Sequence, residues 1–433
     1  MKRRTFLKGG AVAGATTLVA APAIAQGAPE IKWRLTSSFP KSLDTIYGTA
    51  QTFAKYVAEA TDNKFQIQTF AAGELVPGLQ ALDAVSVASV EMAQTPLYFY
   101  IGKEPALAYA TGAPFGMNHR HQESWWYFGG GADLTNEALK PFKTHAILCG
   151  NSGTQMGGWF RKEIKTVDDL KGLKFRIAGM GGHVLARLGI VPQQLAGGDV
   201  YAALEKGSID AAEFVGPYDD EKLGFQKVAK YYYFPGWWEG GAMLHMIVND
   251  EKWASLPKQY QAIVNQAASA AGAWMLEKYD SVNPAALKRL IANGAELKAF
   301  PQPVLEACYN ATQEHLNELA AKSDLFKRTK ESHDAYMKEL LFYAQIAETS
   351  TTTICSARCV TRLDDEQGAV TTPRPALVGW AKAHLRRAHV LCVTCNGGHA
   401  SAFALRATAD KSLCPPFGTC RVAPYAAPSP SFA

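Results

Sequence analysis

Residues 173–188, LKFRIAGMGGHVLARL, place an apolar stretch before a glycine-rich turn and then a stretch with helical spacing. The apolar residues of 173–178 predict a strand, and 183–188 predict the start of a helix. Further along the chain, 199–204 form a capped helical pattern and 209–215 form a second strand pattern. Strands that alternate with helices in this way predict a mostly parallel sheet covered by helices, which is the α/β class.

The same alternation extends through most of the 433 residues. Further strands are predicted at 31–37, 64–70, 90–95, 145–150, 158–162, 243–249 and 296–300. Helices are predicted at 46–57, 77–88, 255–274, 285–292, 304–322 and 325–349, and a capping box of Thr166 and Asp169 opens a shorter one.

A chain of this length favours two domains rather than one. We expect lobe I at 26–143 and lobe II at 144–250, with a helical C-terminal section at 251–350 that completes both lobes. Two α/β lobes leave a cleft where the carboxyl ends of their strands face each other. Small ligands bind in clefts of this kind.

The first 25 residues are predicted to be an export signal. Lys2, Arg3, Arg4 and Lys8 precede a mildly apolar stretch that ends at the small residues 23–25. Glycine, threonine and proline interrupt that stretch, which is shorter than the roughly 20 apolar residues of a membrane span. Because two arginines stand together, the signal resembles the twin-arginine type. We therefore predict a periplasmic protein.

The last part of the chain, 351–433, differs from the rest in composition. Six of the eight cysteines lie there, at positions 355, 359, 392, 395, 414 and 420. Their spacing allows a metal or disulfide module, for example a zinc-dependent interaction module, although the flanking residues show no strand pattern. The alternative, which we favour, is non-native sequence translated out of frame after about residue 350.

Charge gives no indication of nucleic-acid binding. The whole chain is +5, but the tail has nine Lys/Arg against four Asp/Glu, and the first 25 residues have four basic residues and no acid. Residues 26–350 are therefore net acidic, at about −4. We expect no basic surface that would attract a nucleic acid.

Four polar residues are candidates for the cleft: Arg176 lies inside an apolar strand, Gln155 lies in a loop, and Glu213 and Glu239 end apolar or aromatic stretches. Arg176 precedes the glycine-rich turn, where a guanidinium and free helix amides suit a small carboxylate; a solvent-facing edge arginine is the alternative. The glycines match a dinucleotide-binding loop poorly, because Val184 occupies the third glycine position. Gln155, Glu213 and Glu239 complete the set.

Two carboxylates and an arginine in one cleft allow two kinds of chemistry. Glu213 and Glu239 can act as a general acid/base pair, which would make the chain an exported enzyme for a small carboxylate or a sugar. They can instead bind a hard cation that bridges to an anionic ligand. Spacing does not decide between the two, but 26–350 contain no clustered Cys/His set and no G-x-S-x-G motif.

Longer segments resemble a known family. LKGLKFRIAGMGG (170–182), VPQQLAGGDVYAALEKGSIDAAEFVGPYDD (191–220) and GELVPGLQALDAVSVASVEMA (73–93) resemble the DctP-type extracytoplasmic solute-binding proteins of TRAP transporters. GNSGTQMGGWF (150–160) and YYYFPGWWEGG (231–241) are closest to the subgroup that binds 2-oxo acids or lactate with a cation. The resemblance covers about residues 30–350.

This resemblance implies a two-lobed periplasmic binding protein fold, type II-like, with long C-terminal helices. It implies a protein that breaks no bond, closes on a small 2-oxo or 2-hydroxy monocarboxylate such as pyruvate or lactate, and delivers it to the TRAP membrane permease. Some relatives exchange a long C-terminal helix, so the resemblance also implies that a homodimer can form through the C-terminal helices.

The resemblance assigns roles to the four candidates. Arg176 would pair with the ligand carboxylate, and Glu239 would reach the oxygen side of the ligand. Gln155 and Glu213 would contact a bound cation, either sodium or calcium.

Three aromatic residues complete the implied site. Phe214 stands where the family usually has tryptophan; a cation contact through its backbone carbonyl would survive this change, whereas a contact through an indole N–H would not. Tyr98 and Tyr100 would line the pocket from lobe I.

Overall fold

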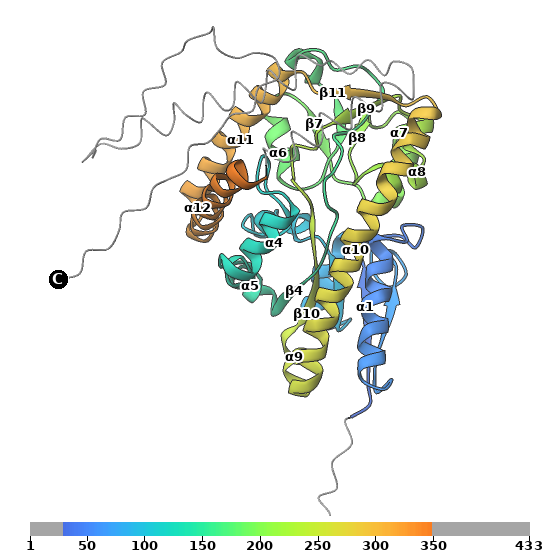
Figure 1. The fold of residues 1–433 in the computed structure, drawn as a ribbon, viewed down its shortest axis with the longest axis vertical. Helices are drawn as coiled ribbons and strands as arrows, with labels where there is room; N and C mark the ends of the chain where they lie inside the picture. Colours follow the sequence, from blue (N-terminus) through green and yellow to red (C-terminus); the bar gives the residue numbers. More distant parts are fainter. Residues whose placement is uncertain (1–28, 349–433) are drawn as a thin grey trace, which may run out of the picture. The chain divides into compact units, whose positions relative to one another are not determined.

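The computed structural model describes residues 29–348, which contain two β-sheets and the helices that cover them (Figure 1). Five strands form the first sheet, in the order β2-β1-β3-β10-β4, and six form the second, in the order β11-β9-β5-β8-β6-β7. The α/β class and the long C-terminal helices are therefore confirmed.

The first sheet is mostly parallel. Its strands are β1 (Ile31–Ser37), β2 (Phe65–Phe70), β3 (Met92–Thr95), β4 (Thr144–Asn151) and β10 (Met243–Asn249). β1 pairs in parallel with β2 and β3, whereas β10 runs antiparallel to β3 and β4. Along β2, Phe65 and Ile67 are buried and the residue after each of them is exposed. The alternation of apolar and polar residues therefore identified this strand correctly.

The second sheet is built from shorter strands. They are β5 (Gly158–Phe160), β6 (Lys174–Arg176), β7 (Val191–Gln193), β8 (Ala211–Ala212), β9 (Tyr231–Phe234) and β11 (Glu296–Ala299). The strand predicted at 209–215 shortens to the two residues of β8, so Glu213 and Phe214 lie just beyond its end. We did not predict β9, because its four aromatic residues show no alternation of apolar and polar side chains.

Two crossovers between the sheets correct the predicted lobe boundaries. We expected 144–250 to form lobe II, but β4 and β10 pair within the first sheet. All 7 residues of β10 are buried, as expected of a central strand with both faces covered. The chain passes to the second sheet through 152–157 and returns through 235–242. Below, the first lobe is the five-stranded sheet with its helices, and the second lobe is the six-stranded sheet with its helices.

Most helices of the two lobes lie where they were predicted. They are α1 (Ile46–Ala60) and α2 (Ala81–Ser86) in the first lobe, and α6 (Gly179–Ala186) and α7 (Val200–Glu205) in the second; α8 (Pro217–Leu223), also in the second lobe, was not predicted. α6 begins at Gly179 rather than at His183, directly after the strand that carries Arg176. The capping box of Thr166 and Asp169 is present and opens the short 3-10 helix η4 (Val167–Leu170).

α10 (Lys258–Ala292) is one continuous helix, although two helices were predicted. Pro284 lies inside it, and an interior proline normally breaks a helix because it removes a backbone donor. Contacts on both sides of the exposed Pro284 hold the helix together: Asn283 accepts from the backbone of Tyr218, and Arg289 donates to Glu221. Figure 1 shows α10 beside α1 and reaching α8, so it packs on both lobes.

The remaining helices connect the lobes a second time. α3 (Leu107–Thr111), α4 (His119–Phe128) and α5 (Gly131–Leu139) fill the middle stretch that lacked a clear pattern, and α9 (Asp250–Ser255), α11 (Gln302–Lys322) and α12 (Asp324–Ala347) follow β10. α11 packs on α6, whereas α12 packs on α3, α4 and α5 (Figure 1). His333 of α12 lies between the rings of Tyr109 and Trp125, with centroids 4.9 and 5.4 Å away.

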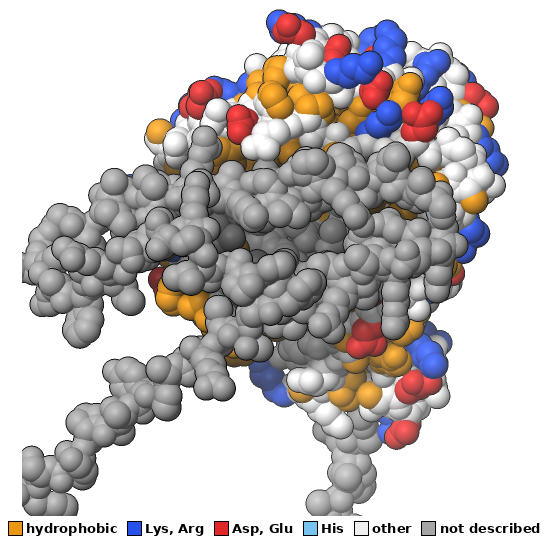
Figure 2. Space-filling view, turned by 45° about the horizontal axis from the view of Figure 1, so that its top comes forward, with side chains coloured by type: hydrophobic (Ala, Val, Ile, Leu, Met, Phe, Trp, Pro, Cys, Tyr) orange, Lys and Arg blue, Asp and Glu red, His pale blue; other side chains and the backbone are white. Residues whose placement is uncertain are grey.

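Every helix within residues 29–348 is too short or too polar to cross a bilayer. On the face shown in Figure 2, basic and acidic side chains of the described residues are interspersed rather than sorted by sign. The predicted export signal and the cysteine-rich tail lie outside the described residues.

Candidate functional site

Gln155, Arg176, Glu213 and Glu239 are brought together where the two lobes meet. Arg176 ends β6 and Glu213 follows β8; because these strands are parallel neighbours, both residues lie at the same edge of the second sheet. Gln155 and Glu239 stand on the two crossover segments. The exposed fraction of the four residues is between 1% and 3%, so protein encloses the group.

Arg176 and Glu213 are joined directly. Arg176 Nη1 donates to Oε1 of Glu213 at 2.6 Å, and Ala178 N–H donates to the same oxygen at 2.9 Å. Arg176 Nε donates to the backbone carbonyl of Leu195 at 3.1 Å. Among the described residues, no group accepts a hydrogen bond from Nη2 of Arg176, which leaves this nitrogen for a small anion.

Two buried oxygens in the group have no hydrogen-bond partner among the described residues: Glu213 Oε2 and Gln155 Oε1. The other amide atom of Gln155, Nε2, donates to Ser152 Oγ at 2.8 Å, which directs Oε1 away from that bond. Unpaired buried oxygens are costly, and a hard cation that prefers oxygen ligands would satisfy both. The described residues contain no cluster of three His, Cys, Asp or Glu side chains suited to a metal. A cation here would therefore rely on amide, backbone and ligand oxygens besides one carboxylate.

Burial sets the electrostatics of both glutamates. It raises the pKa of Glu213, although Arg176 and the Ala178 N–H oppose the shift. Burial and then the neighbouring Glu213 raise the pKa of Glu239 well above its usual value, with Arg176 and Gln155 opposing. With Glu239 protonated, the charges of Glu213 and Arg176 balance, so a bound carboxylate would add a net negative charge that a cation would offset.

Of the two predicted tyrosines, the structure brings Tyr98 to the group and leaves Tyr100 in the first lobe. Burial is the main cause that raises the pKa of Tyr98; Glu239 and Glu213 raise it further and Arg176 lowers it, so all three charged residues act on its hydroxyl group. Tyr100 differs because its hydroxyl is bonded to Thr95 Oγ1 at 2.9 Å and accepts from Leu82 N at 3.2 Å. These bonds hold Tyr100 in the core of the first lobe.

Phe214 contributes a ring rather than a polar atom. The Cζ atom of Arg176 lies 5.4 Å from the centroid of the Phe214 ring, a distance at which a guanidinium interacts with an aromatic face. The ring packs over Gly197, where a Cβ atom would lie 2.5 Å from ring atom Cε2. The phenyl ring thus packs between the Arg176 guanidinium and Gly197.

Two residues of the site were not predicted. Ser152 Oγ accepts from Gln155 Nε2 and from Ala242 N at 2.9 Å, so it ties the two crossovers together. Trp238 Nε1 is buried without a hydrogen-bond partner among the described residues. Their positions within the GNSGTQ and WWEGG segments were the available signal, but a serine in a loop and a tryptophan in an aromatic run resemble ordinary packing.

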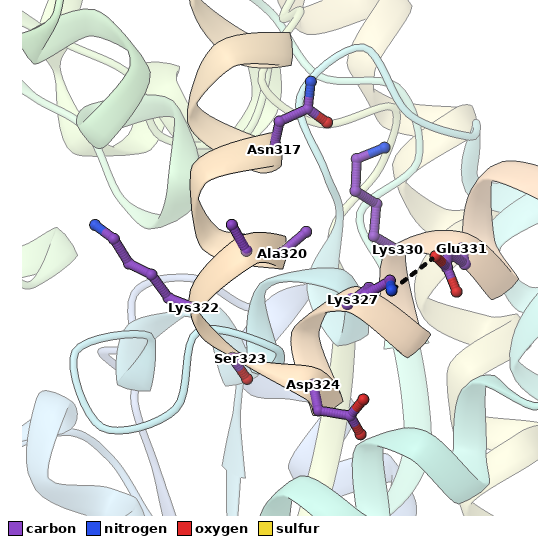
Figure 3. A pocket seen from close by; sticks show the side chains of 9 residues that line it. Asn317, Ala320, Lys322, Ser323, Asp324, Lys327, Lys330 and Glu331 are labelled. Atoms are coloured by element: carbon purple, nitrogen blue, oxygen red, sulfur yellow. Dashed lines mark ion pairs between the residues drawn. The ribbon is translucent and has the colours of Figure 1, made fainter.

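A separate hollow of about 520 Å³ lies at the junction of α11 and α12 (Figure 3). Its lining includes Lys322, Asp324, Lys327 and Glu331, and Lys327 pairs with Glu331 at 4.0 Å. None of the predicted site residues lines it, so it is unrelated to the buried group.

Comparison with known families gives two matches. Residues 36–323 match the family described as bacterial extracellular solute-binding protein, family 7. Residues 1–20 match the signal sequence of the twin-arginine translocation pathway. A monocarboxylate 2-oxoacid-binding periplasmic protein of a Nostoc species is 48% identical over 356 residues, covering 81% of this chain and 98% of the relative.

Solved structures of similar proteins carry ligands and cations. A TRAP transporter solute-binding protein from Bordetella bronchiseptica, a dimer with copurified calcium and picolinate, is 47% identical, with a TM-score of 0.76 and coverage of 77% of this chain and 99% of that one. One from Colwellia psychrerythraea, with calcium and pyruvate, is 34% identical (TM-score 0.72; 75% and 99% covered). One from Pseudoalteromonas atlantica, with sodium and pyruvate, is 35% identical (TM-score 0.73; 75% and 99% covered).

Proposed function

The chain belongs to family 7 of the bacterial extracellular solute-binding proteins, and from this membership we propose that it captures a 2-oxo monocarboxylate of the size of pyruvate together with a cation. It is the periplasmic solute-binding subunit of a TRAP transporter and carries a twin-arginine export signal. The single observation that supports the ligand class is the enclosed group of Arg176, Glu213, Gln155 and Glu239.

The geometry supports a division of labour within this group. Nη2 of Arg176 would bind the ligand carboxylate, because the other guanidinium nitrogens already donate to Glu213 and Leu195. Tyr98 would close over the ligand from the first lobe. Glu239, whose pKa is raised, would present a protonated oxygen to the 2-oxo or 2-hydroxy group of the ligand.

The cation would lie between the ligand and the unpaired oxygens Glu213 Oε2 and Gln155 Oε1. Similar proteins hold calcium or sodium beside their ligands, and either ion suits oxygen ligands. A backbone carbonyl, with that of Phe214 as the candidate from the sequence, would add to the ligand set.

We propose that the chain catalyses no reaction. Its family is that of a transport subunit. In an acid/base pair Glu213 could act only through Oε2, because Oε1 already accepts from Arg176 and the Ala178 N–H.

The partners of the protein follow from the family. A solute-binding subunit of a TRAP transporter delivers its ligand to membrane permease subunits. A homodimer through α12 remains a proposal, which the dimeric Bordetella bronchiseptica relative supports. The end of α12 exposes Leu341, Phe342, Tyr343 and Ile346, as an association surface would.

Calorimetry tests the ligand and the cation together. The purified protein is stripped of bound metal with a chelator and titrated with pyruvate, first without added cation, then with calcium and then with sodium. We expect binding that strengthens at least about tenfold when one of the cations is present. Absence of pyruvate binding in all three titrations would refute the proposed function.

A further inference from the structure

Gly179, the first residue of α6, occupies a position that no other residue can fill without displacing the first lobe. Its φ is +66°, a conformation that side chains rarely adopt. A Cβ atom at Gly179 would overlap Cδ2 of the Tyr98 ring and would lie 2.9 Å from Cε2 and 3.1 Å from Cγ. The Tyr98 ring therefore lies directly against the backbone of this glycine.

This contact joins the two lobes above the buried group. Tyr98 belongs to η2 (Leu97–Tyr100), which follows β3 of the first sheet, and Gly179 follows β6 of the second. Ala178, the residue before Gly179, donates its N–H to Glu213. A hydrogen bond also joins the two lobes nearby, from Gln194 Nε2 to the carbonyl of Phe99 at 3.4 Å.

Tyr98 has little freedom to move aside. Its backbone N–H donates to Thr111 Oγ1 at 3.1 Å, and its ring stacks on Phe99 with centroids 5.2 Å apart. The exposed fraction of Tyr98 is 8%. A methyl group at position 179 would therefore move the two lobes apart rather than rotate the ring.

We propose that Gly179 is a positioning residue that sets how closely the first lobe closes over the ligand, and thereby how long the ligand is retained. This inference rests on the proposed function, because it needs a ligand that is enclosed by lobe closure. Gly179 would not touch the ligand; it would act by allowing the Tyr98 ring to reach its place beside Arg176 and Glu213.

The test compares Gly179→Ala with Gly172→Ala in the full chain, with pyruvate and calcium as the probe. Gly172 is a matched control in the same lobe, because its φ of +73° imposes similar backbone strain and a Cβ atom there would meet nothing within 4 Å. We expect Gly179→Ala to release pyruvate roughly tenfold faster than Gly172→Ala in stopped-flow measurements, with little change in the association rate. Equal dissociation rates in the two variants would overturn the proposal.

A double variant separates a steric effect from general damage. If the added methyl group acts through the Tyr98 ring, Gly179→Ala combined with Tyr98→Ala should release pyruvate no faster than Tyr98→Ala alone. A double variant that releases pyruvate about tenfold faster than Tyr98→Ala alone would overturn the proposal. If Gly179→Ala does not fold, Tyr98→Phe and Tyr98→Ala test the contact from the other side: removing the ring must accelerate release more than removing the hydroxyl, and the reverse order refutes the proposal.

A wild-type protein that fails to bind pyruvate would refute the proposed function and the inference that rests on it. A wild-type protein that binds pyruvate, together with a Gly179→Ala variant that retains it as long as Gly172→Ala does, would refute the inference alone.

Discussion

Arg176 and Glu213 are bonded twice through one nitrogen: Nη1 of Arg176 donates at 2.6 Å both to the carboxylate and to the backbone carbonyl of Glu213. This arrangement fixes the guanidinium plane. It leaves Nη1 and Nε bonded within the protein, because Nε donates to the carbonyl of Leu195. A lysine cannot reproduce it, because an ammonium group has no planar fork.

Arg176→Lys is therefore expected to weaken pyruvate binding by about 3 kcal/mol, or roughly a hundredfold, while it keeps the charge beside Glu213. Calorimetry measures the affinity, and thermal unfolding confirms that the variant folds. Arg187→Lys is the control, since Arg187 pairs with Glu314 and Glu318 on the surface. An unchanged affinity in Arg176→Lys would show that Nη2 does not bind the carboxylate.

Glu213→Gln should uncouple the ligand from the cation. Glutamine can still accept bonds from Arg176 and Ala178 but loses the negative charge that favours a cation at Oε2. We expect pyruvate affinity in this variant to respond less than about threefold to calcium, against at least about tenfold in the wild type. Titrations with and without chelator measure this ratio. A wild-type calcium response in Glu213→Gln would place the cation elsewhere.

Asp219 and Asp220 predict a dependence of stability on pH. Both are buried on α8 and accept bonds from neutral donors, Asp219 from Tyr279 and Asp220 from Trp159 and Tyr232. Burial raises the pKa of each to about 7. The folded state therefore holds protons that the unfolded chain releases near pH 4, so the free energy of unfolding falls as pH rises from about 4 to 7.

Asp219→Asn removes one of these groups and should flatten that pH dependence. The asparagine oxygen can still accept from Tyr279, and its amide can occupy the place of Oδ1, which has no partner among the described residues. When the pH rises from 5 to 8, the free energy of unfolding of the wild type should fall by about 2–4 kcal/mol more than that of the variant. Urea unfolding at both pH values measures this change. A pH-independent difference between variant and wild type would contradict it.

Lys222→Ala should weaken the closed arrangement of the lobes. Lys222 of the second lobe pairs with Asp44 of the first, which also accepts from Tyr218 Oη at 3.2 Å and lies 3.3 Å from Lys278 Nζ. Because these groups are partly exposed, the pair is worth only about 0.5–1 kcal/mol, and pyruvate should dissociate about two- to fivefold faster.

Salt provides a check on this effect. The difference in dissociation rate between Lys222→Ala and the wild type should shrink at high ionic strength, since the Asp44 pair is then screened. Lys230→Ala is the control, because Lys230 pairs with Glu296 at 2.5 Å within the second lobe. Equal dissociation rates for Lys222→Ala and Lys230→Ala at low salt would remove the pair from the closing mechanism.

Local pattern was sufficient for the elements that obey local rules. The alternation of β2, the capping box of Thr166 and Asp169, and the polar residues at the ends of β6 and β8 were all visible in the sequence. Arg176 and Glu213 were both predicted to face the cleft because each stands near the end of a predicted strand, and the structure then shows that their strands are parallel neighbours.

Tertiary contacts decided the features that the sequence did not reveal. β10 joins the first sheet because β3 and β4 leave a central place for a wholly buried strand, and nothing in its own residues specifies that partner. α10 continues through Pro284 because contacts of Asn283 before it and of Arg289 after it compensate for the lost bond. Tyr98 and Tyr100 are two residues apart in the same aromatic run, and only the bonds of Tyr100 to Thr95 and Leu82 distinguish them.

The crossover segments 152–157 and 235–242 have a consequence for how such a protein can change over evolutionary time. These two segments, which join the lobes, also carry Gln155 and Glu239, and Ser152 bonds one segment to the other. If Gln155 and Glu239 contact the ligand as proposed, a substitution there that changes which acid is recognised is also expected to change how quickly the lobes separate. Tight capture of the ligand at low concentration and fast release of it at high concentration would depend on the same few residues. An improvement in one property is therefore expected to weaken the other.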